Sequence, residues 1–404
     1  MSEFPCPVCG CSSAESILSL GCGNIDNSKL YPTVRLNSCT TCGHAFNVLS
    51  PGEITGLDDY YNNEYAPANL NSVVKDGDLP GSTGLYTRGR YLDLYEMLAP
   101  QLNQNGSVLD VGCAVGGFLD FLKQKGFTSL FGVDTAEAYV DRACEKQYVV
   151  ELGNAEQLPF ADCCFDALVI EQVMEHLVHP WKAFREAGRV LKPGGVLCIG
   201  VPDASRYPEF YFYDFYWLLM REHIQHFDIH GLSHLASLHG FELVDFRQSS
   251  HPIMGEKMVM PSLSASFRYQ VQADCVKAHA VRSSLPNTMK HYVETETARL
   301  EKRRDKIRKI RDSQRPVYVW GVGREFLYLY ESAGLKDCNL AGFIDMNPFK
   351  QSSVQVNGKA VESDEKIGLI EKDAILIITA IAHEGIIKEN AYRGGYNGEI
   401  VSIV

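Results

Sequence analysis

The sequence lacks the features that mark several large classes of protein. No run approaches the ~18 consecutive apolar residues that a membrane-spanning helix needs. Positive charge is scarce, since 38 lysines and arginines face 50 aspartates and glutamates and the net charge is −12. This balance argues against a nucleic-acid partner. The amino terminus has no basic region followed by an apolar core, so we expect no signal peptide.

Length and composition are those of an ordinary globular protein with more than one domain. The chain has 404 residues, of which 45% are hydrophobic and 22% charged, so we expect two or three domains. Thirteen cysteines are present. Because the chain is large and has no export signal, we expect free thiols and a metal site in a reducing cytoplasm, not disulfides.

Two Cys-x-x-Cys pairs stand near the amino terminus, about thirty residues apart: Cys6 with Cys9, and Cys39 with Cys42. Each pair places two sulfurs on one side of a turn, and four thiolates complete a tetrahedral zinc site with no open position for catalysis. We therefore predict a structural zinc in a module covering residues 1–80. The alternative is chance spacing in a cysteine-rich chain. Spare candidate ligands lie in the same segment: Cys11, Cys22 and His44.

A glycine-rich stretch, Val108–Leu119, organises the middle of the chain. Apolar residues lead into Asp110, a turn follows, and a helical pattern then begins, which is typical of a buried parallel strand, a tight turn and a helix. Gly112 and Gly116 lack a Cβ, so a ligand can approach the backbone closely. Turns of this kind bind nucleotide-like cofactors in α/β sheets.

Residues 81–250 alternate strand and helix patterns, which predicts a parallel sheet. Asp134 ends the second predicted strand, 24 positions after Asp110. A carboxylate at about this offset binds ribose hydroxyls in dinucleotide sites. The alternatives are a strand-end cap for Asp134 and a hydrogen bond to the backbone of the turn for Asp110.

Five motifs in order carry a resemblance to class I S-adenosylmethionine-dependent methyltransferases. They are Asp110–Gly116, Asp134, Asn154–Pro159, Phe165-Asp166 and Leu191-Lys-Pro-Gly-Gly195. The resemblance implies a Rossmann-like methyltransferase core. It also implies a role for each matching position. Gly112 and Gly116, with Asp110 beside them, would pass under the methionine part of the cofactor, and Asp134 would bind the ribose. Ala155 and Glu156 would flank the adenine, and Glu171 would lie near the sulfonium.

Glu222 and His223 form the candidate catalytic pair. Histidine titrates near neutrality and suits general-base work, and an adjacent carboxylate orients it. His176 is a second candidate, because it follows the strand that carries Glu171. The alternative for His223 is a packing role, since further histidines crowd nearby. An aromatic segment, 207–217, is expected to line a core or an acceptor pocket.

The end of the chain starts a new α/β pattern. Residues 251–315 are predicted to be a linker that becomes helical, and its basic stretch, 299–311, is interrupted by acids, which favours a solvated helix over a nucleic-acid arm. Residues 316–404 repeat strand, glycine turn and helix, with Asp345 24 positions after Gly321. With only two glycines in the turn, we expect a degenerate Rossmann-like domain that packs or helps to hold substrate.

The order of these parts resembles the sugar C-methyltransferases of deoxysugar pathways, which act on nucleotide-linked ketosugars. The resemblance is carried by the four cysteines, Tyr60–Tyr65, Glu222-His223 and Gly342–Lys350. It implies that His223 removes a proton beside the ketone with Glu222 as its partner. A tyrosine such as Tyr65 and His176 would steady the enolate.

Three alternatives remain beside this hypothesis. The chain has Met220 where that family often has a tyrosine, and the same pair suits an O-methyltransferase that deprotonates a hydroxyl. A scaffold that binds nucleotide-sugar without turnover is a second alternative. A nicotinamide oxidoreductase that uses the turn within 317–345 is the third.

Overall fold

The computed structural model describes residues 5–23, 28–70, 80–210, 217–253, 258–270 and 282–403. The chain divides into two compact units, which are described separately. The first contains the described parts of residues 1–17, 35–210 and 221–291, and the second those of residues 18–34, 211–220 and 292–404. Among the described helices, none has the length and apolar content to cross a membrane.

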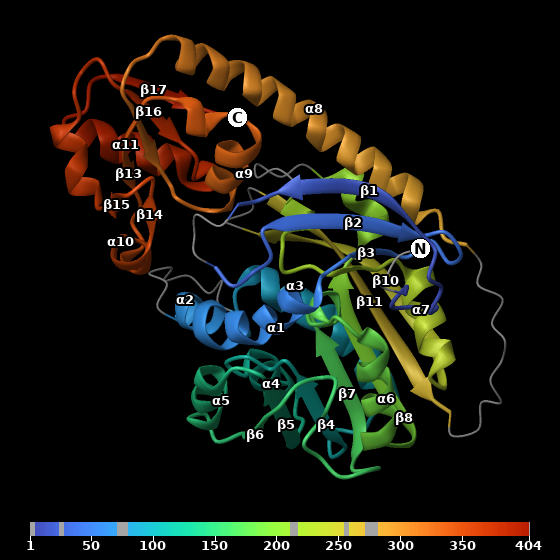
Figure 1. Cartoon of the computed structure of the whole chain (residues 1–404). Coiled ribbons are helices and arrows are strands. Elements are labelled where there is room, and N and C mark those ends of the chain that lie inside the picture. The colour runs from blue at the N-terminus through green and yellow to red at the C-terminus, as the bar shows by residue number, and fades with distance from the viewer. Residues whose placement is uncertain are drawn as a thin grey trace. The chain divides into compact units, whose positions relative to one another are not determined.

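A seven-stranded sheet is the centre of the first unit (Figure 1). Its order is β10-β11-β8-β7-β4-β5-β6, in which the five strands from β8 to β6 are parallel and β10 and β11 are antiparallel. The strands are β4 Ser107–Val111, β5 Ser129–Asp134, β6 Val149–Leu152, β7 Phe165–Glu171, β8 Leu191–Pro202, β10 Phe241–Ile253 and β11 Met258–Tyr269.

Helices cover both faces of this sheet, because successive side chains of a buried strand point to opposite faces. Leu109 and Val111 of β4 pack in one apolar cluster with residues of α6 and α7. Val108, on the same strand, packs in a second cluster with residues of α3 and α4. The helices of the first unit are α1 Pro51–Tyr60, α2 Ala66–Leu70, α3 Leu85–Leu98, α4 Gly117–Gln124, α5 Glu137–Cys144, α6 Pro180–Val190 and α7 Ile229–Leu238.

A smaller sheet has the order β1-β2-β3-β9. Its strands are β1 Ala14–Gly21, β2 Thr33–Cys39, β3 Ala45–Asn47 and β9 Gln225–His226. β3 and β9 are antiparallel, with Ala45 opposite His226 and Phe46 opposite Gln225. This pairing joins the cysteine-rich segment to the chain that carries Glu222 and His223.

The second unit contains another α/β sheet, of order β14-β15-β13-β12-β16-β17. Every neighbouring pair in it is parallel except β14 with β15. Its strands are β12 Val317–Trp320, β13 Leu340–Ile344, β14 Gln355–Val356, β15 Lys359–Glu362, β16 Ile375–Ile378 and β17 Glu399–Ser402. The remaining helices are α8 Leu285–Asp312, which spans the division between the units, α9 Arg324–Ser332, α10 Pro348–Ser353 and α11 Glu384–Arg393.

The predicted α/β class is confirmed, and the first sheet extends further than we expected. β10 runs past residue 250 and β11 lies wholly within the predicted linker, where it pairs with β8. The core therefore reaches Tyr269, because β11 pairs antiparallel with both β8 and β10. In the aromatic segment 207–217, residues 211–216 lie outside the described residues.

Candidate functional site

The glycine turn lies at the carboxyl end of β4, where the sequence predicts it. Gly112 and Gly116 both have φ of 78°, a left-handed conformation that glycine adopts without strain. The backbone N–H groups of Gly112 and Cys113 donate to the carbonyl of Val133, at 2.8 and 3.1 Å. A Cβ on Gly112 would lie 2.3 Å from Cγ2 of Val173. The turn is thus fixed to its neighbouring strand and requires glycine at this position.

Asp134 closes the same end of the sheet. Its Oδ2 accepts from the N–H of Ala114 at 2.9 Å, and its Oδ1 accepts from the N–H of Ala136 at 3.0 Å. Burial raises the pKa of this carboxyl, and these two backbone donors oppose the shift. An ionised carboxylate has about four lone-pair positions, so Asp134 supports the turn and keeps acceptor capacity for ligand hydroxyls.

Asp110 is buried at the carboxyl end of β4, and Glu171, with 11% of its side chain exposed, lies at the carboxyl end of β7. Burial raises the pKa of Asp110, and the charges of Glu171 and Asp134 raise it further. Glu171 forms an ion pair with Arg90, with 2.7 Å between Oε1 and Nη1. Burial raises the pKa of Glu171, and Arg90 opposes the shift. Arg90, on α3, is a site residue that sequence reasoning missed.

Ala155 and Glu156 follow β6, and Ala155 is buried. The carboxylate of Glu156 is held at the start of α6, where it accepts from the N–H of His179 at 3.1 Å and from Nζ of Lys182 at 3.0 Å. Both of its oxygens thus have partners within the protein. Glu156 therefore helps to position α6, in addition to its predicted role at the adenine.

The Glu222-His223 segment is held from two sides by backbone pairing. Asn47 of β3 donates from its N–H to the carbonyl of Ile224 and from Nδ2 to the carbonyl of His223, both at 2.7 Å. The N–H of Ile224 donates to the carbonyl of Glu175 at 2.7 Å. His223 is 4% exposed. The small sheet therefore fixes the candidate base next to the chain that follows β7.

Tyrosines surround the candidate catalytic pair. Tyr60 donates to Oε1 of Glu222 at 2.9 Å, and the hydroxyl of Tyr61 lies 3.1 Å from Nδ1 of His176. That Nδ1 also lies 2.7 Å from the carbonyl of Glu222. Tyr65, the tyrosine singled out from the sequence, packs instead beside the apolar cluster that contains Ala114 of the turn. The tyrosines thus extend from the glycine turn to Glu222.

A π-helical turn, Tyr61–Tyr65, presents these side chains. Such turns are rare and occur often at functional sites. The rings of Tyr60, Tyr61 and Tyr65 lie 5.2 to 6.0 Å apart in edge-to-face and tilted contacts, which is the usual geometry of packed aromatic rings. Packing among the tyrosine rings and contact with the candidate catalytic pair therefore coexist in this cluster.

Glu175 is a second residue that sequence reasoning missed. Its side chain is buried, and neither carboxylate oxygen has a hydrogen-bond partner in the part of the chain that the structure describes. Oε1 lies 3.9 Å from Nε2 of His176. Burial raises the pKa of Glu175 to about 8 and lowers the pKa of His176. The adjacency of Glu175 to His176 was the available signal.

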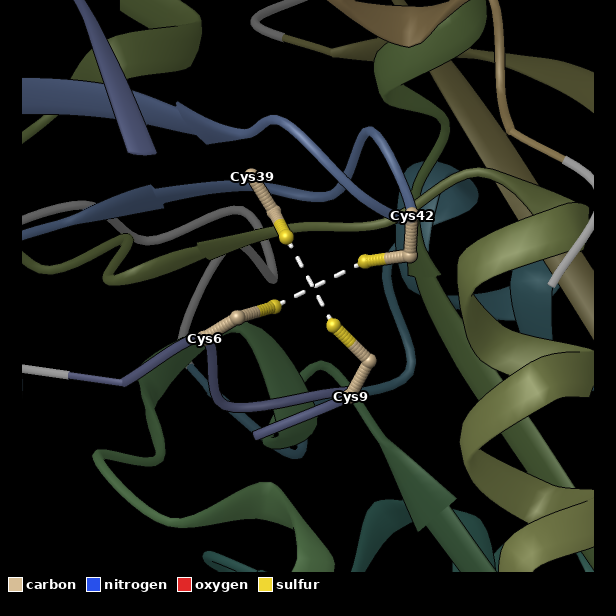
Figure 2. Close-up of side chains that lie close together, drawn as sticks. All are labelled: Cys6, Cys9, Cys39 and Cys42. Atoms are coloured by element: carbon tan, nitrogen blue, oxygen red, sulfur yellow. Dashed lines mark hydrogen bonds between the residues drawn. The ribbon is translucent and has the colours of Figure 1, made fainter. Parts of the chain in front are cut away.

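The four predicted zinc ligands converge (Figure 2). The sulfurs of Cys6 and Cys42 lie 3.6 Å apart and those of Cys9 and Cys39 3.5 Å apart, and all four lie within 4.8 Å of one another. Sulfurs around a tetrahedral zinc are separated by about 3.8 Å, given Zn–S bonds of about 2.3 Å. The geometry and the all-sulfur donor set fit zinc.

Comparison with known proteins gives a family match in the central region. Residues 85–245 match the family model described as a methyltransferase domain. These residues include the glycine turn, Asp134, Glu171 and the Glu222-His223 pair. The match leaves out the cysteine cluster and the second α/β sheet.

Individual relatives match in the same region. A 27-O-demethylrifamycin SV methyltransferase of Amycolatopsis mediterranei is 30% identical over 107 residues, which are 24% of this chain and 39% of that protein. An uncharacterized 37.1 kDa protein from a transposon of Streptomyces fradiae is 36% identical over 104 residues, which are 24% of this chain and 30% of that protein. The chain thus spans well under two thirds of the length of these relatives.

Solved structures of low similarity were also found. A SAM-dependent methyltransferase of Methanosarcina mazei is 19% identical to this chain, with a TM-score of 0.38. The alignment covers 45% of this chain and 100% of that one.

Proposed function

We propose that this chain, whose residues 85–245 match the methyltransferase-domain family model, transfers the methyl group of S-adenosylmethionine to a small molecule. The observation that carries the proposal is the grouping of the glycine turn, Asp134 and Glu171 at the carboxyl ends of three adjacent parallel strands. Ligands of open α/β sheets bind at this edge. Bound S-adenosylmethionine supplies an electrophilic methyl group.

The described residues fit that cofactor. The backbone at Gly112 and Gly116 allows close approach, and Asp134 retains acceptor positions for two hydroxyls. Glu171 is a largely buried carboxylate, with 11% of its side chain exposed, and its negative charge favours a cationic ligand. Asp110 lies on the neighbouring strand, close enough for the charge of Glu171 to raise its pKa.

For the acceptor, the resemblance to deoxysugar enzymes favours a nucleotide-linked ketosugar methylated at carbon. His223 is proposed to take the proton from the carbon beside the ketone. Glu222, held by Tyr60, orients it. Tyr61 supplies a donor for the oxygen on which negative charge develops, and His176 lies beside Tyr61. The contact between Tyr61 and His176 supports this arrangement.

Methylation at oxygen is the second candidate. One relative is named as a 27-O-demethylrifamycin SV methyltransferase. A base placed like His223 can take a proton from a hydroxyl as readily as from an activated carbon. The scaffold and oxidoreductase alternatives have less support, because the methyltransferase match covers the glycine turn and its aspartate.

The test of the proposed function is incubation with S-adenosylmethionine and a panel of nucleotide-linked ketosugars. Mass spectrometry detects the gain of a methyl group, and NMR locates it. A new methyl on carbon supports the leading proposal, and one on oxygen supports the second. No methylated product and no affinity for S-adenosylmethionine would overturn both.

The candidate base has a direct test. We expect His223→Ala to abolish turnover while the affinity for S-adenosylmethionine, measured by titration calorimetry, stays within a few-fold. His230→Ala, at an exposed histidine of α7, is the matched control and should retain turnover. Turnover of wild-type size in His223→Ala would assign His223 a packing role.

We also propose that the cysteine cluster binds a structural zinc. Cys39→Ser should lose zinc by elemental analysis and lower the free energy of unfolding on the order of 4 kcal/mol, because structural metal contributes to folding directly. Cys144→Ser, at an exposed cysteine outside the cluster, should keep one zinc and the original stability. Retention of equimolar zinc by Cys39→Ser would contradict this ligand set.

A further inference from the structure

We propose that Glu175, His176 and His223 form a second metal site, which binds a divalent transition-metal ion such as Zn²⁺ and thereby inhibits the enzyme. One ligand atom from each residue lies within 4.8 Å of the others. The three ligand atoms around one such ion are separated by roughly 3 to 4 Å, so small side-chain rotations close the site. All three residues belong to the first unit.

Glu175 provides the first reason. It is 1% exposed, and within the described ranges both of its carboxylate oxygens lack hydrogen-bond donors. A buried carboxylate without donors is costly unless it is paired with a cation or protonated. Oε1 lies 3.9 Å from Nε2 of His176, a gap too long for a hydrogen bond. A metal ion between the two atoms satisfies both.

The orientation of His176 provides the second reason. Its Nδ1 lies 2.7 Å from the backbone carbonyl of Glu222, so Nδ1 carries the proton and donates to that oxygen. The lone pair is then on Nε2, the nitrogen nearest Glu175. Metal-binding histidines usually donate their other ring N–H to a carbonyl or carboxylate in this way. His176 is therefore already in the tautomer and orientation of a ligand.

His223 completes the set. The centres of its ring and that of His176 lie 5.2 Å apart at an interplanar angle of 65°. Asn47 fixes its backbone through the bond from Nδ2 to the His223 carbonyl. Two imidazoles and one carboxylate suit Zn²⁺, Co²⁺ or Ni²⁺ better than Mg²⁺ or Ca²⁺, which prefer all-oxygen sites. The donor set also differs from the four sulfurs of the cysteine cluster.

Occupation of this site has a functional consequence. A base needs a free lone pair, and coordination takes that of His223. The metal-bound form is therefore inactive, and this consequence rests on the proposed function of His223. Binding of the ion itself depends only on the three side chains. The two statements can accordingly be tested apart.

Binding is tested by titrating CoCl₂ into protein that carries one equivalent of zinc, so that the second site is left open. Zinc keeps the cysteine cluster filled, so the added Co²⁺ reports the second site. We expect one equivalent to bind, with visible d–d absorption and no thiolate-to-metal charge-transfer band. Glu175→Gln, which keeps the size of the side chain, should weaken binding at least about tenfold. His230→Asn, at an exposed histidine, should leave the affinity unchanged.

Two results would overturn the metal site: no binding of Co²⁺ by the zinc-loaded protein, or equal affinity in wild type and Glu175→Gln. Circular dichroism checks that Glu175→Gln is folded. For the inhibitory role, Zn²⁺ should stop methyl transfer and brief chelation should restore it. Full activity at saturating metal would overturn that role. Calorimetry with S-adenosylmethionine on the same samples tests the proposed function separately, since failure there leaves Co²⁺ binding intact.

Discussion

The two α/β sheets of this chain use the same device at the carboxyl end of their first two parallel strands. In each, an aspartate follows or ends the second strand and accepts one backbone N–H from the glycine turn. It accepts another from the residue two positions further on. The distances are 2.9 and 3.0 Å for Asp134, and 2.7 and 2.9 Å for Asp345. The device stabilises a strand–turn–helix unit whether or not a cofactor binds there.

The difference lies in the charges around each aspartate. Lys350 lies 2.9 Å from Oδ2 of Asp345, whereas no lysine or arginine of the described residues forms an ion pair with Asp134. Arg90, a buried cation of the same unit, is paired with Glu171. The carboxylates beside the first glycine turn thus suit hydroxyls and a cationic cofactor. Beside the second turn, Lys350 neutralises Asp345. A shared fold therefore does not imply a shared ligand.

Replacing each aspartate with alanine should show the difference between the two sheets most clearly. Asp134→Ala should lower the affinity for S-adenosylmethionine by about 10- to 100-fold, because hydrogen bonds to a charged group contribute about 1.5–3 kcal/mol. Asp345→Ala should leave that affinity unchanged. Titration calorimetry measures both, with thermal unfolding as the check on folding. Equal losses in the two variants would mean that the comparison is wrong.

Lowering the pH should affect the stability of the two units differently, because buried histidines lie in the first unit only. Burial lowers the pKa of His44 and His176 and lowers that of His226 to about 3. The second unit contains only His383, which is exposed. At each of these histidines the unfolded state binds more protons than the folded state, so their contribution to stability is complete above about pH 6.5 and is lost as the pH falls toward 3.

At pH 5, His226 alone should cost the first unit about 2 kcal/mol relative to pH 7. Hydrogen exchange measured by mass spectrometry resolves the two units. Between pH 7 and pH 5, β4 and β7 should lose more protection in wild type than in His226→Phe, and β12 and β16 should not differ between the two proteins. His230→Asn should behave like wild type. A parallel loss in both units would contradict this assignment.

The smallest expected effect concerns the glycines. Gly112→Ala forces a left-handed conformation on alanine, at about 1–2 kcal/mol, and places its Cβ 2.3 Å from Val173. Gly323 has φ of −117°, and a Cβ added there would have only Nζ of Lys350 nearby, at 3.8 Å. Gly323→Ala should thus change the free energy of unfolding by less than about 0.5 kcal/mol. Denaturant titration compares the two variants.

Much of the fold could be predicted because its signals are local. The strand before Gly112, the aspartate after the next strand and the Cys-x-x-Cys spacing each lie within a short stretch of sequence. The end of the first sheet could not be predicted in this way. The sequence of β11 contains Pro261, which argues against a central strand. Its pairing with β8 and β10 places it in the core.

The candidate catalytic site was predicted only in part, since its contacts join distant residues. Tyr60 reaches Glu222 across 162 positions, and Tyr61 reaches His176 across 115. No local pattern distinguishes them from Tyr65, which packs beside the turn. Glu175 stands next to His176 in the sequence, but its burial without donors is visible only in the structure.

A single pair of titrations decides which cofactor the acidic edge of the first sheet accepts. The wild-type protein is titrated by calorimetry with S-adenosylmethionine and, separately, with NADPH. We expect one equivalent of S-adenosylmethionine to bind per chain and no binding of the nicotinamide cofactor. Binding of NADPH alone would contradict the proposed function, because the acidic edge at Asp134 and Glu171 would then not be the methyl-donor site.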